Sequence, residues 1–112
     1  MQTKSVTELK AELAALGPVL PGSISKQWNV CGKPGCRCKD PKRPRRHGPY
    51  YQLSFTVAGR SSTLFLKPGE LVAVRRHLRR YRRFRELNAR LIAAYVAEAR
   101  LGGVASLEKG VE

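Results

Sequence analysis

Three cysteines and one histidine lie close together in the sequence and could jointly bind a metal ion. Cys31, Cys36 and Cys38 follow the spacing C-x4-C-x-C, and His47 comes nine residues after Cys38. Thiolates and imidazoles are ligands that zinc prefers, and a structural zinc site closes a tetrahedron with four of them. The segment Gly32–Gly35, with two glycines and a proline, permits the tight turn that brings Cys31 and Cys36 to one ion. The sequence therefore predicts a structural Zn²⁺ site in which His47 is reached through the flexible segment that follows the cysteines.

The same residues are compatible with other metal-binding arrangements and with a metal-free loop. His77 or Asp40 could supply the fourth ligand, although His77 falls on the apolar side of a predicted helix, where a packed histidine is expected. The cysteines could also be reduced and metal-free, with His47 contacting phosphate. An iron–sulfur cluster normally requires four thiolates, and this sequence has three cysteines. An odd number of cysteines in a protein expected in the reducing cytoplasm does not indicate disulfides.

The positive charge of the chain is concentrated in its middle. The formal net charge is +14 at pH 7, and the segments 1–30 and 91–112 carry +1 and −1, so all of the +14 lies within residues 31–90. Such a concentration of one sign repels itself and lowers the stability of the compact state. It therefore favours a polyanionic partner, and nucleic acid, either duplex DNA or structured RNA, is the first candidate.

Two groups of basic residues and one tyrosine are the candidate nucleic-acid contacts. The first group, called the basic loop below, consists of Lys33, Arg37, Lys39, Lys42, Arg43, Arg45 and Arg46. The second group, called the arginine stripe, consists of Arg75, Arg76, Arg79, Arg80, Arg82, Arg83 and Arg90. Arginine forks suit bidentate phosphate contacts, and Tyr50 is the candidate for stacking on a base. The loop and the stripe are expected to clamp a phosphate backbone from one continuous face.

The sequence patterns around these residues predict an α+β fold whose helices and strands would hold them in place. Ser5 and Glu8 have the spacing of a capping box, which predicts a short helix over about residues 6–16. Alternating apolar residues predict strands over 23–30, 51–57 and 61–67, the last two joined in a hairpin at Ala58-Gly59. Because a hairpin alone is marginally stable in water, the three strands are expected to form one antiparallel sheet.

A helix of about 30 residues is predicted from Pro68 to Arg100, which corresponds to a length of ~45 Å. Its apolar residues recur at three-and-four spacing, with the arginine stripe on the opposite arc. The C-terminal half of this helix is predicted to offer a surface for self-association or for a second protein, through Leu91, Ile92, Tyr95 and Val96. Residues 1–101 are expected to form a single zinc-stapled domain, and residues 102–112 a flexible tail.

The cysteine segment also carries a resemblance. The run Cys-Gly-Lys-Pro-Gly-Cys-Arg-Cys, then His-Gly-Pro-Tyr-Tyr, a hairpin and a helix containing Tyr-Arg-Arg-Phe-Arg-Glu-Leu resemble a family of short basic prokaryotic proteins, which is known only as a domain of unknown function and is often found with mobile elements. The resemblance covers residues 22–91. It supports grouping the three cysteines with His47, and it implies no particular activity.

The sequence contains neither a recognisable catalytic constellation nor a membrane segment. Asp40, Glu70 and Glu86 lie in different predicted elements, and no nucleophile triad or P-loop is present. No apolar run approaches the ~20 residues that span a bilayer, and the N-terminus lacks a signal-peptide apolar core. We therefore expect a non-enzymatic nucleic-acid-binding protein of the cytoplasm. The alternative is an adaptor that docks on a larger nucleoprotein machine of a mobile element.

Overall fold

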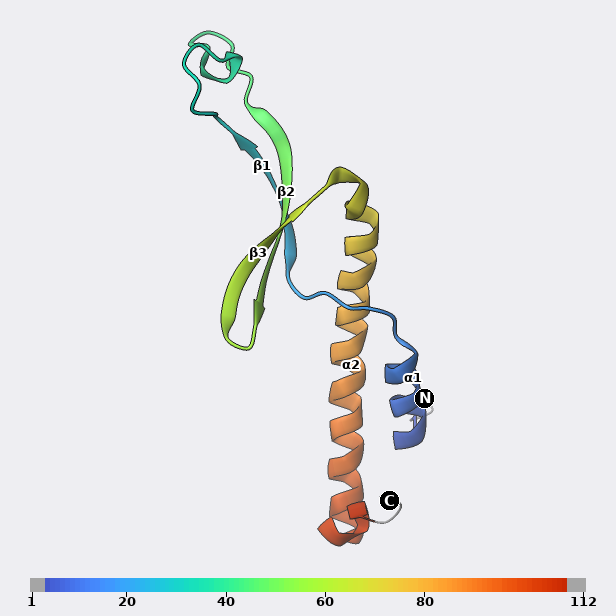
Figure 1. Cartoon of the computed structure of the whole chain (residues 1–112). Helices are drawn as coiled ribbons and strands as arrows, with labels where there is room; N and C mark the ends of the chain where they lie inside the picture. Colours follow the sequence, from blue (N-terminus) through green and yellow to red (C-terminus); the bar gives the residue numbers. More distant parts are fainter. Residues whose placement is uncertain (1–3, 109–112) are drawn as a thin grey trace. The chain divides into compact units, whose positions relative to one another are not determined.

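The computed structural model describes residues 4–108 of the chain. In chain order the main elements are α1 (Val6–Ala15), β1 (Ser23–Asn29), β2 (His47–Val57), β3 (Arg60–Leu66) and α2 (Leu71–Gly102) (Figure 1). Short 3₁₀ helices occur at Arg37–Lys39, Pro68–Glu70 and Val104–Glu108. The predicted α+β fold is confirmed: a short N-terminal helix, a three-stranded antiparallel sheet and a long C-terminal helix.

The chain divides into two compact units. The first, called the sheet unit, is Leu20–Leu78, and the second, called the helical unit, combines Met1–Val19 with Arg79–Glu112. The boundary falls inside α2, so the arginine stripe is divided as well: Arg75 and Arg76 belong to the sheet unit and the other five arginines to the helical unit. That residues 1–101 form a single domain stays a prediction.

The sheet unit is built on one apolar face of the sheet. The strands lie in the order β1-β2-β3, and Leu53 of β2 pairs with Ile24 on one side and Leu64 on the other. Because alternate residues of a strand point to opposite faces, the predicted period-two pattern of β2 turns Leu53 inward. Leu53 is fully buried and clusters with Leu66 and with Val74 of α2. The partly buried hydrophobic residues packed against this cluster are Leu20, Ile24, Tyr51, Phe55, Leu71 and Leu78.

β2 begins at His47, four residues before the start predicted at Tyr51. The last pair between β2 and β3 joins Tyr51 to Leu66, but β1 continues to pair with β2 as far as Asn29 and His47. Proline lacks an N–H group and is poorly tolerated in a central strand. Pro49 is accommodated because it lies beyond the end of β3, where β2 has a neighbour on one side.

The helical unit contains α1 and the part of α2 that begins at Arg79. The side chain of Ser5 accepts a hydrogen bond from the backbone N–H of Glu8 at 3.2 Å, so the predicted helix start is confirmed. Among the described residues of this unit, Leu9 of α1 and Leu87 of α2 are the buried hydrophobic ones, with 2% and 1% of their surfaces exposed. Glu12 links the two helices, because its carboxylate pairs with Arg83 of α2 at 3.3 Å.

A short 3₁₀ helix follows the C-terminal end of α2, and that residues 102–112 form a flexible tail stays a prediction. After the left-handed residue Gly103 (φ 80°), Val104–Glu108 form a 3₁₀ helix in which the Ser106 hydroxyl donates to the carbonyl of Gly103 at 2.7 Å. Residues 109–112 of the predicted tail lie outside the described residues. Between residues 4 and 108, no helix combines the length and the apolar character that crossing a membrane requires.

Candidate metal centre

The three cysteines and His47 form one compact cluster near the end of the sheet. Their potential ligand atoms all lie within 4.8 Å of one another. The sulfur atoms of Cys31 and Cys38 are 3.5 Å apart, and the sulfur of Cys36 is 3.1 Å from Nε2 of His47. Zinc–sulfur bonds of ~2.3 Å and zinc–nitrogen bonds of ~2.0 Å give a tetrahedron with edges of about 3.5–3.8 Å. The predicted group of four is therefore confirmed as a cluster that could hold a metal ion.

The register of the first two strands brings the first and last ligands together. Asn29, the last residue of β1, pairs with His47, the first residue of β2, and Cys31 follows Asn29 by two residues. His47 is thus delivered by the sheet ladder, rather than by the flexible segment that the sequence suggested. Figure 1 shows the connecting loop at the end of β1 and β2, away from the β2–β3 turn.

A tight turn within that loop supplies the other two ligands. Arg37–Lys39 form a 3₁₀ helix, in which the N–H of Lys39 donates to the carbonyl of Cys36 at 2.9 Å. The backbone N–H of Arg45 donates to the carbonyl of Arg37, also at 2.9 Å, and closes the loop on itself. The turn folds Cys36 and Cys38 back toward the strand ends.

An irregularity in β2 decides which face of the sheet His47 occupies. Between the pairs Gln27–Tyr50 and Asn29–His47, one residue of β1 lies opposite two residues of β2, Gly48-Pro49. This bulge shifts the alternation of β2 by one position. His47 therefore shares a face with Tyr50, although three positions separate them and a regular strand would place them on opposite faces.

Gly48 is required at this bulge for two reasons. Its φ of 136° lies in a region that favours glycine. A Cβ atom at this position would also lie 2.8 Å from the carbonyl oxygen of Gln27 and 3.3 Å from the ring of Trp28. The close approach of β1 to the residue after His47 therefore leaves no space for a side chain.

The protonation of the cysteines responds to their surroundings. The pKa of Cys36 is lowered to about 6, because the backbone N–H of Cys38 donates to its sulfur and the side chains of Cys31 and His47 interact with it as well. Burial raises the pKa of the Cys38 thiol, of which 2% is exposed. The N–H of Cys31 lies 3.4 Å from the Cys38 sulfur and can donate to it. A bound divalent cation deprotonates coordinating thiols outright, so all three cysteines fit the ligand role.

The two other candidates for the fourth ligand have different positions. The carboxylate of Asp40 accepts hydrogen bonds from the backbone N–H groups of Lys42 at 2.9 Å and Arg43 at 3.3 Å, which orders the loop. His77 lies on α2, and its carbonyl accepts a hydrogen bond from the N–H of Leu20 at 3.2 Å. Neither belongs to the group of potential metal ligands found among residues 4–108. His47 is the residue that completes the cluster.

Two surface hollows flank the cluster, and residues of the basic loop line both. The base hollow, of about 400 Å³, is lined by Asn29, Cys31, Lys33, Cys36, His47 and Tyr50. The arginine hollow, of about 330 Å³, is lined by Cys36, Arg37, Arg45, Arg46, His47 and Gly48. The side chains of all seven basic-loop residues are exposed. The two hollows share Cys36 and His47, so the group of candidate metal ligands forms the boundary between them.

The arginine stripe is partly engaged with its own chain. Arg83 pairs with Glu12 and with Glu86, and Arg90 also pairs with Glu86, at 2.9 Å. Arg80 is half-buried, and its guanidinium lies 3.4 Å from the carbonyl oxygen of Pro18. The remaining members of the stripe are exposed and make no ion pair within the described part of the chain: Arg75, Arg76, Arg79 and Arg82.

Asn29 is a residue of this region that the sequence did not single out. Its position two residues before Cys31, at the expected end of a strand, is the signal that could have identified it.

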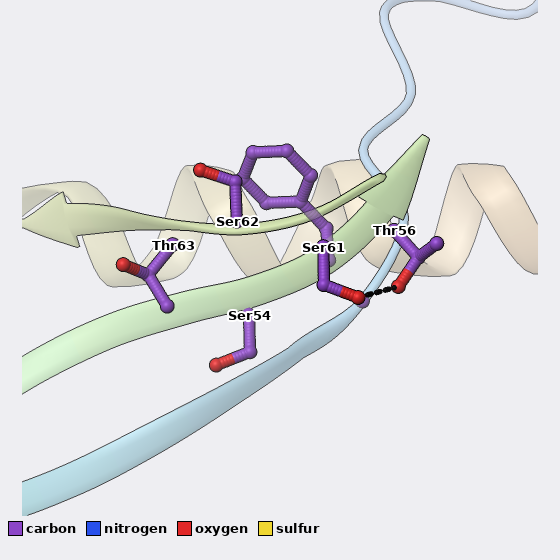
Figure 2. A pocket seen from close by; sticks show the side chains of 7 residues that line it. Ser54, Thr56, Ser61, Ser62 and Thr63 are labelled. Carbon is purple, nitrogen blue, oxygen red and sulfur yellow. Dashed lines mark hydrogen bonds between the residues drawn. The ribbon is translucent and has the colours of Figure 1, made fainter. Parts of the chain in front are cut away.

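A third hollow, of about 580 Å³ on the β2–β3 hairpin, is lined by Gly22, Ser54, Phe55, Thr56, Ser61, Ser62 and Thr63. Figure 2 shows the hydroxyls of Thr56 and Ser61 turned toward each other, at 2.8 Å. This lining carries no cation that would attract phosphate, and it lies apart from the metal ligands.

Comparison with known proteins assigns the chain to a family. No curated protein and no solved structure matches it. A family model described as "Domain of unknown function (DUF6788)" matches residues 2–76, which is more than half of the 112 residues. The match includes the sheet and the metal cluster; it begins earlier and ends earlier than the resemblance over residues 22–91. An association with mobile elements stays a prediction. The chain therefore belongs to the family of the domain of unknown function DUF6788.

Proposed function

We propose that this protein is a non-enzymatic nucleic-acid-binding protein in which a structural zinc ion holds the basic loop in shape. The observation that carries the proposal is the lining of the two hollows beside the metal cluster, which contains the cations Lys33, Arg37, Arg45 and Arg46. Cations that converge on one small site repel one another, and a bound polyanion offsets that repulsion. Phosphate groups of a nucleic acid are the partner that fits this arrangement.

Zinc is the metal that the donor set favours. Three thiolates and one imidazole form a soft, tetrahedral ligand set that is typical of structural zinc sites. Four protein ligands leave no open position for a substrate or a water nucleophile, so the ion would stabilise the loop rather than take part in a reaction. The proposal that the protein is not an enzyme rests on this closed ligand set.

The arginine stripe provides a second set of phosphate contacts. Arg75, Arg76, Arg79 and Arg82 are exposed, and neighbouring like charges one turn apart, such as Arg79 and Arg83 of the helical unit, destabilise an isolated helix. A phosphate backbone along this stretch of α2 would remove the cost. The exposed arginines of the helix and the basic loop would then add their contacts to the same electrostatic binding energy.

Fluorescence anisotropy with labelled oligonucleotides tests this function. Duplex DNA, an RNA hairpin and a single strand are each titrated with the protein at 50 mM and 200 mM salt. For roughly six to ten phosphate contacts, the affinity should fall by about 10³–10⁵ over this range. The double substitution Arg45→Gln with Arg46→Gln should reduce the salt slope by about 2, roughly one for each lost contact.

Arg60→Gln provides the matched control. Arg60 is an exposed arginine beside the β2–β3 turn, at the opposite end of β2 from His47, and its loss should leave the salt slope unchanged. Absent or salt-insensitive binding of all three oligonucleotides would sink the proposal. If Arg60→Gln reduced the salt slope as much as the double substitution, the basic loop would have no specific role in binding.

A second candidate function rests on the apolar residues exposed on the C-terminal part of the chain. Ile92, Val96 and Leu101 of α2 expose 62%, 46% and 91% of their surfaces. Exposed apolar residues of this kind are typical of a protein–protein interface, either that of an adaptor that docks on a larger nucleoprotein complex or that of a chain that associates with itself. Sedimentation equilibrium of the protein and of the Ile92→Ser, Val96→Ser variant tests self-association: a dimer that the substitutions dissociate favours it.

A further inference from the structure

The base hollow combines three side chains that together suit a nucleotide. Tyr50 contributes an aromatic ring, Lys33 an ammonium group and Asn29 an amide, and all three line the same hollow of about 400 Å³. An aromatic ring can stack on a base, a lysine can pair with a phosphate, and an asparagine amide can bond to a base edge. Neither the metal ligands nor the phosphate contacts proposed above require this combination.

Tyr50 is held on the open face of the sheet. Its neighbour Tyr51 packs against the apolar core, so alternation turns Tyr50 to the opposite face, where 39% of its surface is exposed. The Gly48-Pro49 bulge brings His47, and with it the metal cluster, to that same face. An aromatic side chain on a sheet surface beside cations is the arrangement with which single strands are commonly bound.

Lys33 and Asn29 are placed by the elements that build the metal site. Lys33 lies in the short connection between the ligands Cys31 and Cys36, so a metal ion would restrain both ends of its segment. Asn29 is held in the β1–β2 ladder by its pairing with His47. The two polar groups therefore sit on anchored backbone at the edge of the hollow.

The neighbouring arginine hollow continues the site. It shares Cys36 and His47 with the base hollow, and Arg37, Arg45 and Arg46 line it. A strand whose base enters the base hollow would carry its next phosphates across the metal cluster to these arginines. The order of the groups, an aromatic ring followed by several cations, matches the order of a base and its sugar–phosphate backbone.

We infer that the base hollow binds one unpaired nucleotide, of a single strand or of a loop in structured RNA, with its base stacked on Tyr50 and its phosphate on Lys33. In a duplex both faces of each base are covered by neighbours, so an aromatic side chain can stack on a base that has left the helix. The inference rests on the proposed nucleic-acid binding and narrows it to an unpaired segment.

Anisotropy titrations with a labelled single strand and with the same sequence in a duplex test this inference, using three variants. Tyr50→Leu removes the ring and should weaken single-strand binding by about 5- to 150-fold, the range expected for one stacked base. Tyr50→Phe keeps the ring and should stay within about 2-fold of the wild type on the same principle. Phe65→Leu is the matched control, because Phe65 is an aromatic residue of β3 with 69% exposure that lies outside the hollow.

The titrations separate the possible failures. Loss of single-strand affinity in Tyr50→Leu, with duplex affinity unchanged and zinc content equal to wild type, supports the inference. Equal affinities of Tyr50→Leu and Phe65→Leu, or an equal loss for single strand and duplex, overturn it while leaving nucleic-acid binding in place. Binding of neither oligonucleotide by the wild type overturns the inference together with the proposed function.

Lys33→Gln gives an independent measurement on the same oligonucleotide. Replacing one phosphate contact on a single strand should reduce the slope of log affinity against log salt by about 0.7. An unchanged slope would exclude a phosphate at Lys33.

Discussion

The sulfur atoms of Cys31 and Cys38 lie 3.5 Å apart, although one cysteine follows a strand end and the other lies in a 3₁₀ turn. A disulfide bond would need about 2.05 Å between them. The separation is instead close to the edge of a tetrahedral zinc–thiolate site. The separation therefore fits two thiolates that could share one ion.

Replacing the fourth ligand should release the metal, and replacing the other histidine should not. The protein purified without chelator is expected to carry about one equivalent of zinc, as structural zinc sites do. Loss of an outer-sphere partner of a ligand already costs ~10–100-fold in metal affinity, so His47→Ala should cost at least that much. His77→Gln is the control, because His77 lies outside the cluster. Zinc content by atomic emission and competition with a chromogenic chelator measure both variants; release by His77→Gln alone would contradict the assignment.

A side chain at position 48 should damage both the sheet end and the metal site. A Cβ there would lie 2.8 Å from the carbonyl of Gln27 at a φ of 136°, so Gly48→Ala is expected to cost more than about 2 kcal/mol. Gly59→Ala is the control: Gly59 also has a positive φ, 78°, but no atom lies within 4 Å of a Cβ there, and the cost should be about 1 kcal/mol. Urea unfolding gives both free energies. Equal costs would show that the close approach of β1 is unimportant.

The core of the sheet unit should depend strongly on Leu53. This side chain is fully buried, so Leu53→Ala should lower the free energy of unfolding by about 2–5 kcal/mol. Its register partner Leu64 is 49% exposed, and Leu64→Ala should cost less than about half as much. Chemical denaturation monitored by circular dichroism distinguishes the two. A cost below 1 kcal/mol for Leu53→Ala, outside the range ~2–5 for buried leucines, would refute the described core.

The ion pairs that Glu12 of α1 forms with Lys4 and with Arg83 of α2 should weaken in acid. A hydrogen bond from Lys4 lowers the pKa of Glu12 below its ordinary value of 4.5, and the positive charge of Arg83 lowers it further. Because the folded form holds the carboxylate in its charged state, this contribution is complete above pH 4.5 and is lost as the pH falls through the lowered pKa.

Amide hydrogen exchange of α1 measures this effect locally, which separates it from loss of metal at low pH. The protection of the α1 amides should fall as the pH drops below 4.5, the ordinary pKa of the glutamate, and Glu12→Gln should remove this pH dependence. Glu8→Gln serves as the control, because Glu8 is an exposed residue of the same helix that contacts Ser5 rather than α2. A pH profile that Glu12→Gln leaves unchanged would rule out the role of this carboxylate.

Local patterns in the sequence predicted the elements well, because each depends on neighbouring residues. The Ser5 cap of α1 and the alternation around Leu53 are examples, and ligand type and spacing were sufficient to group His47 with the cysteines. The pairing of Glu12 with Arg83 joins residues 71 positions apart, and no local pattern encodes it. The start of β2 was also missed, since Pro49 normally indicates the end of a strand and is tolerated here because β3 has already ended.

With a metal ion bound, the bulge at Gly48-Pro49 would make strand alignment and metal binding depend on each other. In a regular ladder, without the bulge, Asn29 would face Gly48, and His47 would move to a position opposite Val30 on the other side of the sheet, with Tyr51. An ion held by both Cys31 and His47 excludes that alignment. The metal would thus stabilise one of the two registers in which the same residues of β1 and β2 can pair.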